Sequence, residues 1–162
     1  MRELVKPSRI FIHGLESSSQ GTKGAFFKKM YPDMIVEDFF GNFDERMAKL
    51  DIILAGKNDI ILVGSSYGGL MASVFACRTK KKIKKLILLA PALNHMPPQK
   101  RRLIKLGSPV IIYHGSKDEV VPPGPVYELA RALFTNLAWH LVDDDHFLHE
   151  TFFHLDWKNL LS

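Results

Sequence analysis

Cysteine is almost absent from the 162-residue sequence, which contains only Cys77. A single cysteine cannot form an internal disulfide, and this favours a reducing compartment such as the cytoplasm. Apolar residues never run on for the roughly 18 positions that a transmembrane helix needs. The stretch 1–14 carries charges throughout and lacks the apolar core of a secretory signal peptide. We therefore expect a cytoplasmic protein without a membrane span.

The residue spacings that hold metals or nucleotides are also missing. Neither H-E-x-x-H nor C-x-x-C occurs, and the run "DDDH" at 143–146 lacks the loop pattern of a calcium site. The glycine-rich motifs G-x-G-x-x-G and G-x-x-x-x-G-K-S/T, which cradle dinucleotides and phosphates, do not occur either. The sequence predicts no metal and no cofactor.

Positive charge is in excess, with a net charge of +5, and much of it lies in "TKKKIKK" at 79–85. No aromatic residue interleaves with these lysines, as it would in a groove that stacks nucleic-acid bases. The run follows a segment with helical spacing, so we expect its cations to complement the negative C-terminal end of that helix. No nucleic-acid partner is predicted.

Six short apolar runs recur along the chain, and most are continuous rather than alternating, as in strands buried on both faces of a parallel sheet. They lie at 9–13, 34–40, 59–63, 86–90, 109–114 and 138–142. Apolar residues with helical spacing occupy the intervals, around 26–31, 47–54, 70–75, 126–134 and 152–161. This alternation predicts a three-layer α/β/α sandwich with a mostly parallel sheet of about six strands.

The segment 94–108 interrupts the alternation with two prolines and four basic residues. We interpret it as a loop or a single helical turn. Its cations, Lys100, Arg101, Arg102 and Lys105, are expected near the mouth of a cleft, where they would favour anionic substrates. No repeat or linker divides the chain, so residues 1–162 are expected to form one domain.

The run "GSSYGG" at 64–69 follows a predicted strand and precedes a predicted helix. It contains G-x-S-x-G, the pattern of a nucleophile elbow, in which a strained turn lifts a serine hydroxyl clear of the sheet. Gly64 and Gly68 are needed because neighbouring backbone crowds such a turn. Ser66 is therefore the candidate nucleophile.

A serine hydroxyl needs a base to accept its proton, and the base needs a group to orient it. Asp118 lies in "HGSKDEVVP", directly after one predicted strand, and His146 lies in "VDDDHF", directly after the last. Because the carboxyl ends of parallel strands meet at one edge of a sheet, Ser66, Asp118 and His146 are expected to converge. We expect His146 to act as the base and Asp118 to orient it.

Several other residues compete for these roles. The rivals for the acid are Glu119, Asp143, Asp144 and Asp145, and the nearest rival for the base is His149. His140 lies within a predicted strand and His154 well inside the last helix, so neither is expected in the cleft. His13 and His114 each end a strand beside a glycine, and we expect a structural or pocket-lining role for them.

The sequence "FIHGLESSS" follows the first predicted strand, and its His-Gly pair resembles a loop that supplies half of an oxyanion hole. The backbone N–H groups of Leu15 and Tyr67 are the candidate donors. Preorganised donors of this kind contribute roughly 3–4 kcal/mol each to transition-state stabilisation.

These motifs resemble those of the α/β-hydrolases, including their chain order Ser…Asp…His, and in particular the very short bacterial esterase-like members. The resemblance extends from Arg9 to the final helix. It implies a minimal α/β-hydrolase fold that lacks the antiparallel strands opening the larger members. It also implies a lid reduced to 94–108, and so a shallow cleft poorly suited to long-chain lipids.

The resulting prediction is a serine hydrolase of the carboxylesterase type that cleaves small acyl esters through an acyl-Ser66 intermediate. A thioesterase or small-amide hydrolase with the same three residues is one alternative. A binding or regulatory scaffold with little turnover is another. The sequence gives no indication of oligomeric state.

Overall fold

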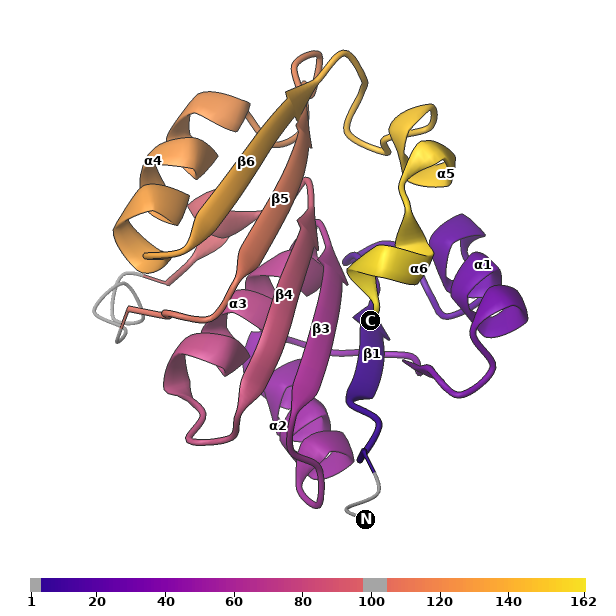
Figure 1. The fold of residues 1–162 in the computed structure, drawn as a ribbon. Coiled ribbons are helices and arrows are strands. Elements are labelled where there is room, and N and C mark those ends of the chain that lie inside the picture. The colour runs from indigo at the N-terminus through magenta and orange to yellow at the C-terminus, as the bar shows by residue number, and fades with distance from the viewer. Residues whose placement is uncertain (1–3, 98–104) are drawn as a thin grey trace.

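A parallel sheet of six strands forms the centre of the computed structural model, which describes residues 4–97 and 105–162 (Figure 1). The strands are β1 (Ser8–Ile12), β2 (Ile35–Val36), β3 (Ile60–Ser65), β4 (Ile83–Leu89), β5 (Val110–Gly115) and β6 (Leu137–Val142). Their order in the sheet is β2-β1-β3-β4-β5-β6, and every neighbouring pair is parallel. The order reverses between β1 and β3, and the crevice beyond such a reversal is where open α/β sheets bind ligands.

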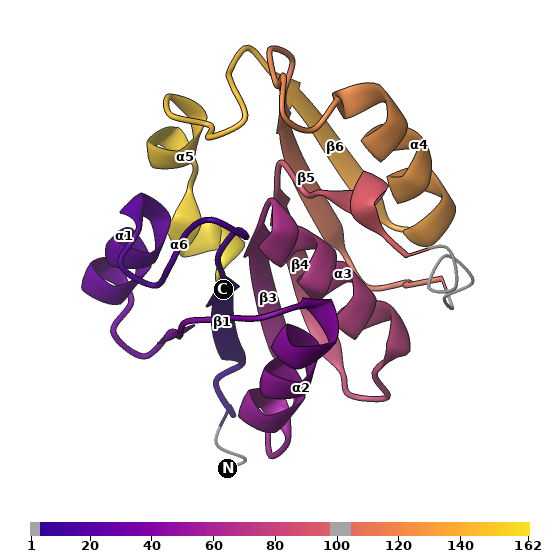
Figure 2. The same cartoon turned by 180° about the vertical axis from the view of Figure 1, so that it is seen from behind.

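Helices cover the two faces of the sheet, so the predicted three-layer architecture is confirmed. They are α1 (Thr22–Met30), α2 (Phe43–Leu54), α3 (Tyr67–Arg78), α4 (Pro123–Leu133), α5 (Thr151–His154) and α6 (Trp157–Leu160), with a short 3₁₀ turn, η1 (Leu93–His95). The helices α2, α3 and α4 lie on one face, seen from the front in Figure 2, and α1, α5 and α6 lie on the other.

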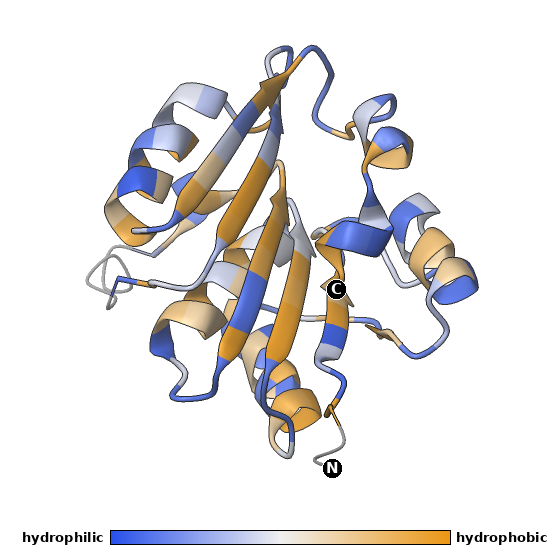
Figure 3. Ribbon diagram, in the orientation of Figure 1, coloured by the Kyte–Doolittle hydropathy of each residue, from blue (hydrophilic) through white to orange (hydrophobic). Residues whose placement is uncertain are grey.

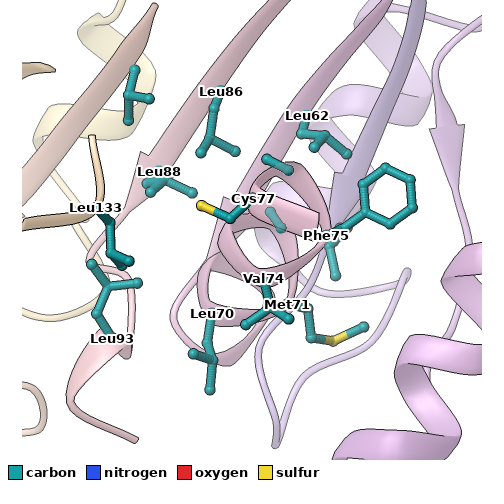
Figure 4. Close-up of a cluster of buried hydrophobic side chains, with 14 of the residues drawn as sticks. Leu62, Leu70, Met71, Val74, Phe75, Cys77, Leu86, Leu88, Leu93 and Leu133 are labelled. Carbon is teal, nitrogen blue, oxygen red and sulfur yellow. The ribbon is translucent and has the colours of Figure 1, made fainter. Parts of the chain in front are cut away.

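Each face of the central strands buries its own apolar cluster, which explains why these strands read as continuous apolar runs (Figure 3). On the α3 face, Leu62, Leu86 and Leu88 pack against helix residues (Figure 4). On the opposite face, strand residues pack against aromatic side chains of α1, α5 and α6, namely Phe27, Phe152 and Trp157. Burial of both faces fixes the register and so the positions of the loops at the strand ends.

Cys77 lies on α3 inside the first cluster, as expected of a small core residue (Figure 4). Its side chain is buried, and this burial raises the pKa of its thiol to about 11. No helix in the described part of the chain is long and apolar enough to cross a bilayer. The cytoplasmic location stays a prediction.

The strand predicted over 34–40 is much shorter in the structure. Only Ile35 and Val36 pair with β1, and the chain then leaves the sheet. The N–H of Phe39 donates to Nε2 of His13 at 2.9 Å instead of to a neighbouring strand, and the Phe39 ring is buried in the apolar cluster on the α3 face. This tertiary contact ends the strand early.

The single terminal helix predicted around 152–161 is divided into two short helices. Leu155 has an extended backbone after α5, and the carboxylate of Asp156 accepts a hydrogen bond from the N–H of Asn159 at the start of α6. The indole N–H of Trp157 donates to the carbonyl of Phe152 at 2.9 Å, which holds the two helices together. The predicted apolar face is thus buried, although the helix is not continuous.

The basic run 79–85 also differs from its prediction. Helix α3 ends at Arg78, and the last three residues of the run belong to β4. The ammonium of Lys81 donates to the carbonyls of Ala55 and Lys57 at the end of α2, and that of Lys85 donates to Leu160 at the end of α6. The lysines do complement helix C-termini, but those of α2 and α6 rather than α3.

The predicted lid 94–108 lies partly outside the described residues, as do Lys100, Arg101 and Arg102. The turn η1 supplies the single helical turn expected near its start. At its other end Leu106 forms an isolated bridge with Phe134, just after α4.

Candidate active site

Ser66 occupies a strained turn between β3 and α3. Its backbone has φ 54° and ψ −115°, a conformation that costs a residue with a side chain about 1–3 kcal/mol. The turn is held because the Ser66 N–H donates to the carbonyl of Leu89, while the Ser66 carbonyl accepts from Gly69, Leu70 and Ala92. The backbone is therefore fixed, and the hydroxyl stands at the carboxyl edge of the sheet.

The glycines around this turn are required by close backbone packing. A Cβ on Gly64 would lie 2.5 Å from the carbonyl oxygen of Gly68, and one on Gly68 would overlap the carbonyl oxygen of Ile12. A Cβ on Gly69 would lie 2.7 Å from Cβ of Pro91. The elbow thus packs directly against β1 and the end of β4, and larger residues would push it away.

The structure brings Ser66, His146 and Asp118 into one hydrogen-bonded chain. Nε2 of His146 lies 3.1 Å from Oγ of Ser66, and Nδ1 of His146 lies 2.7 Å from Oδ2 of Asp118. The Asp118 side chain is fully buried, and that of His146 is 10% exposed. In this geometry the His146 Nδ1–H donates to the carboxylate, which leaves Nε2 free to accept the serine proton.

Backbone groups hold the other oxygen of Asp118. The N–H groups of Val120 and Val121 donate to Oδ1 at 2.9 and 2.7 Å, in a turn that the aspartate closes on its own loop. Hydrogen bonds to the charged form of a buried carboxylate offset its desolvation. These bonds fix the Asp118 side chain beside His146.

The acidic rivals of Asp118 have other partners. Asp143 pairs with Lys117, Asp145 pairs with His149, and Asp144 accepts from the N–H groups of Glu150 and Thr151 at the start of α5. The structure brings none of these three carboxylates to His146.

Gly115 lets the two loops carrying the acid and the base approach each other. A Cβ at this position would overlap the carbonyl oxygens of Asp144 and Asp145. The N–H of Lys117 also donates to the carbonyl of Asp144 at 3.0 Å. The sequence analysis did not identify Gly115 as functional, although its place in the "HG" pair at the end of β5 is the signal that marks it.

The loop after β1 lies against the nucleophile. A Cβ on Gly14 would be 3.5 Å from Cβ of Ser66. The Gly14 carbonyl accepts from the His13 ring at 2.6 Å and from the Ser17 N–H at 3.3 Å, so the N–H of Leu15 in the same trans peptide points the opposite way. Neither Leu15 nor Tyr67 donates its N–H to any residue within 4–97 or 105–162.

His13 is a neutral brace for this loop. Its Nε2 accepts from the N–H of Phe39, so the ring proton is on Nδ1, which donates to Gly14. Burial lowers the pKa of His13 below 6.5, and the nearby charges of Arg46 and Lys49 lower it further. The structural role predicted for His13 agrees with these contacts.

A cavity of about 580 Å³ opens beside Ser66 and His146. Its wall includes the phenyl rings of Phe147, Phe152 and Phe153 from the last loop and α5, and the start of α1 at Lys23. These aromatic residues were not predicted to line the site, because the sequence placed 152 and 153 only on the core face of a helix.

Three other histidines have surroundings that differ from those of His146. His149 lines the cavity mouth but pairs with Asp145, and its side chain is 67% exposed. His140 is exposed on β6 and stacks on Tyr113, and His154 caps its own helix by contacting Glu150. Within residues 4–97 and 105–162, no three His, Cys, Asp or Glu side chains gather to hold a metal ion.

Comparison with known proteins finds similar folds. A family model described as the alpha/beta hydrolase fold matches residues 40–103. An esterase from Pyrococcus furiosus superposes with a TM-score of 0.73 at 18% identity, covering 95% of this chain and 80% of that one. Among curated proteins, no sequence matches the chain.

Two further solved structures have similar coverage. Est1E from Butyrivibrio proteoclasticus has a TM-score of 0.73 at 19% identity, covering 96% of this chain and 86% of that one. Alpha/beta hydrolase domain-containing protein 10 from mouse has a TM-score of 0.71 at 21% identity, covering 89% and 83%. Because these identities are all below 25%, the similarity shows a shared fold only.

Proposed function

We propose that this chain, which has a minimal α/β-hydrolase fold, is a serine hydrolase of the carboxylesterase type that acts on small acyl esters. The observation that carries the proposal is the hydrogen-bonded series Ser66–His146–Asp118, with distances of 3.1 and 2.7 Å. A nucleophile within reach of a base, and a base oriented by a third group, is the arrangement that activates a serine.

In the proposed reaction, the Ser66 oxygen attacks the acyl carbonyl as its proton passes to Nε2 of His146. The buried Asp118 carboxylate keeps the other ring proton on Nδ1 and stabilises the imidazolium that forms. His146 then returns its proton to the leaving alcohol. Water activated by the same histidine hydrolyses the acyl-Ser66 ester, so no cofactor is needed.

The oxyanion of the tetrahedral intermediate needs donors that are fixed before the reaction. The N–H groups of Leu15 and Tyr67 fit this role because both lack acceptors among the described residues and both residues line the cavity beside Ser66. Tyr67 is also the first residue of α3, whose positive N-terminal end favours the developing charge.

The cavity supports an apolar group on the substrate. Its volume of about 580 Å³ falls within the range of small-molecule pockets, and its aromatic wall offers no charge to a bound acyl chain. The three phenylalanines in its wall favour a small apolar acyl group.

The direct test is hydrolysis of p-nitrophenyl esters from acetate to palmitate by the wild type and by Ser66→Ala. We expect turnover of the short esters by the wild type and its loss in the variant. Ser65→Ala removes the neighbouring hydroxyl and is the matched control, which should retain turnover. A fluorophosphonate probe should label the wild type and leave Ser66→Ala unlabelled.

Equal rates for the wild type and Ser66→Ala at every chain length would refute the esterase proposal. Labelling by the probe without ester turnover would then favour the thioesterase or amide hydrolase. Absence of labelling would favour a binding scaffold.

A further inference from the structure

A second buried histidine touches the proposed catalytic acid. His114, at the end of β5, has no exposed surface. Its Nε2 lies 2.9 Å from the carbonyl oxygen of Val121 and 3.2 Å from Oδ2 of Asp118. Both neighbours are acceptors, so Nε2 must carry a proton, which it donates to Val121 while it also faces the Asp118 carboxylate. The proposed reaction makes no use of this group.

The surroundings of Nδ1, the other ring nitrogen, indicate that the His114 ring is uncharged. Nδ1 is buried and has no hydrogen-bond partner among the described residues, so protonating it would bury an unpaired donor. The ring also stacks on Trp139, with centroids 5.6 Å apart and planes at 21°. Burial lowers the pKa of His114 below 6.5. The ring is therefore neutral, with its single proton on Nε2.

We propose that His114 is a positioning residue that sets the orientation of the Asp118 carboxylate through its Nε2–H. The inference rests on the proposed function of the Ser66 site. Oδ2 of Asp118 accepts a hydrogen bond from His146 and contacts Nε2 of His114. Oδ1 accepts hydrogen bonds from two backbone N–H groups. Three hydrogen bonds and the contact with His114 together restrict the rotation of the carboxylate.

The bond from His114 to Val121 extends the same constraint to the backbone. Val121 gives its N–H to Asp118 and its carbonyl to His114, so one residue links the acid to the ring that orients it. Because His114 sits on rigid β5, the loop that carries Asp118 is tied to the sheet. A neutral donor does this without competing with His146 for the negative charge of Asp118.

Three variants of His114 test whether the position of its N–H donor matters or only the presence of a polar group. His114→Gln places an amide N–H where Nε2 stands, whereas His114→Asn places one nearer the unpartnered Nδ1. His114→Phe keeps a ring to stack on Trp139 but removes the donor. Each variant is first checked by thermal unfolding, so that ester kinetics are compared only among folded proteins.

We expect His114→Phe and His114→Asn to lower kcat about 10- to 100-fold, with KM within about twofold, because small misplacements of catalytic groups have effects of this size. His114→Gln should stay within about threefold of the wild type. His140→Gln, on the exposed side of β6, should leave both constants unchanged. Equal kcat for the Gln and Asn variants would overturn the proposal. If His114→Phe does not fold, the comparison of kcat between His114→Gln and His114→Asn is the test of the proposal.

Nuclear magnetic resonance provides a test that does not depend on turnover. Nitrogen-15 shifts of the wild type should show His114 as the neutral Nε2–H form, and a proton on Nδ1 would overturn the proposal. The low-field Nδ1–H signal of His146, caused by its bond to Asp118, should persist in His114→Gln and shift or broaden in His114→Asn. If these signals behave as expected and no ester is cleaved, the proposed function fails but the positioning stands.

Discussion

Two histidines in the last loop, His146 and His149, each pair with an aspartate, and the two hydrogen bonds are the same length. Nδ1 of His146 is 2.7 Å from Asp118, and Nδ1 of His149 is 2.7 Å from Asp145. The side chains of the first pair are 10% and 0% exposed, whereas those of the second are 67% and 46% exposed. The first pair also has Ser66 on its outer nitrogen.

The comparison shows that a short histidine–aspartate bond does not by itself define a catalytic pair. An exposed pair is screened by water and contributes about 0.2–1 kcal/mol. A buried pair keeps its full orientation and charge coupling, and only the pair that also reaches a nucleophile can pass a proton to the reaction. Burial and the third partner distinguish the two.

Replacing the two histidines should give the largest difference in kcat. His146→Ala removes the group that accepts the Ser66 proton, and such a loss lowers kcat on the order of 10⁶-fold. His149→Ala removes an exposed pair and should lower kcat less than about fivefold. Ester kinetics of the two variants side by side test this. Comparable losses in both would mean that the structure does not distinguish them.

Replacing the two aspartates should give the next largest difference in kcat. Asp118→Asn is isosteric but favours the wrong ring tautomer of His146, so kcat should fall about 10⁴-fold. Asp145→Asn should change kcat by less than about fivefold, because its partner is exposed. The measurement is kcat for a short ester at one pH, with unfolding midpoints to show that both variants fold.

Separating the two loops should have an intermediate effect. Gly115→Ala puts a methyl group into the carbonyls of Asp144 and Asp145 and should move the acid away from the base. We expect a loss of about 1–3 kcal/mol in stability and roughly 100-fold in kcat. Gly124→Ala, at a position where a Cβ meets nothing within 4 Å, is the control. Wild-type kinetics in Gly115→Ala would contradict the close approach.

The smallest effect concerns the stability of the loop that carries both histidines. Burial is the largest single influence on the pKa of Asp144 and raises it. Hydrogen bonds from the N–H and hydroxyl of Thr151 and from the N–H groups of Asp145 and Glu150 together outweigh burial and lower this pKa below 3.8. The native state thus binds this proton less readily than the unfolded chain, so the carboxylate stabilises the fold above about pH 4. Asp144→Asn should lower the free energy of unfolding by about 1–2 kcal/mol at neutral pH.

This difference should shrink as the pH falls through the lowered pKa of Asp144, because the wild-type carboxyl then becomes neutral too. Denaturant unfolding of both proteins from pH 2.5 to 7 checks it. A difference that stays constant over this range would show that the charge of Asp144 contributes nothing.

Much of the site was predictable because its parts follow strand ends. The apolar runs indicate the strands, and a parallel sheet brings their carboxyl ends together, so the convergence of Ser66, Asp118 and His146 follows from order alone. The N–H donors on Asp118, the ring of His114 and the contact at Gly115 depend on how two loops pack. No local pattern encodes such contacts.

The same reason explains the errors in the fold. The early end of β2 is set by a bond between Phe39 and His13, 26 residues apart. Lys81 and Lys85 reach helices that lie at least 24 residues away in sequence. Charge type and helix ends are visible in a sequence, whereas the pairing of a given lysine with a given helix is a property of the assembled chain.

The backbone conformation of Ser66 places stability and the proposed catalysis in conflict. With φ at 54°, position 66 is one where glycine relieves strain that any other residue must bear. The substitution that would best suit the architecture is therefore one that deletes the proposed nucleophile. Ser66→Gly should therefore raise the stability of the fold while removing the proposed nucleophile.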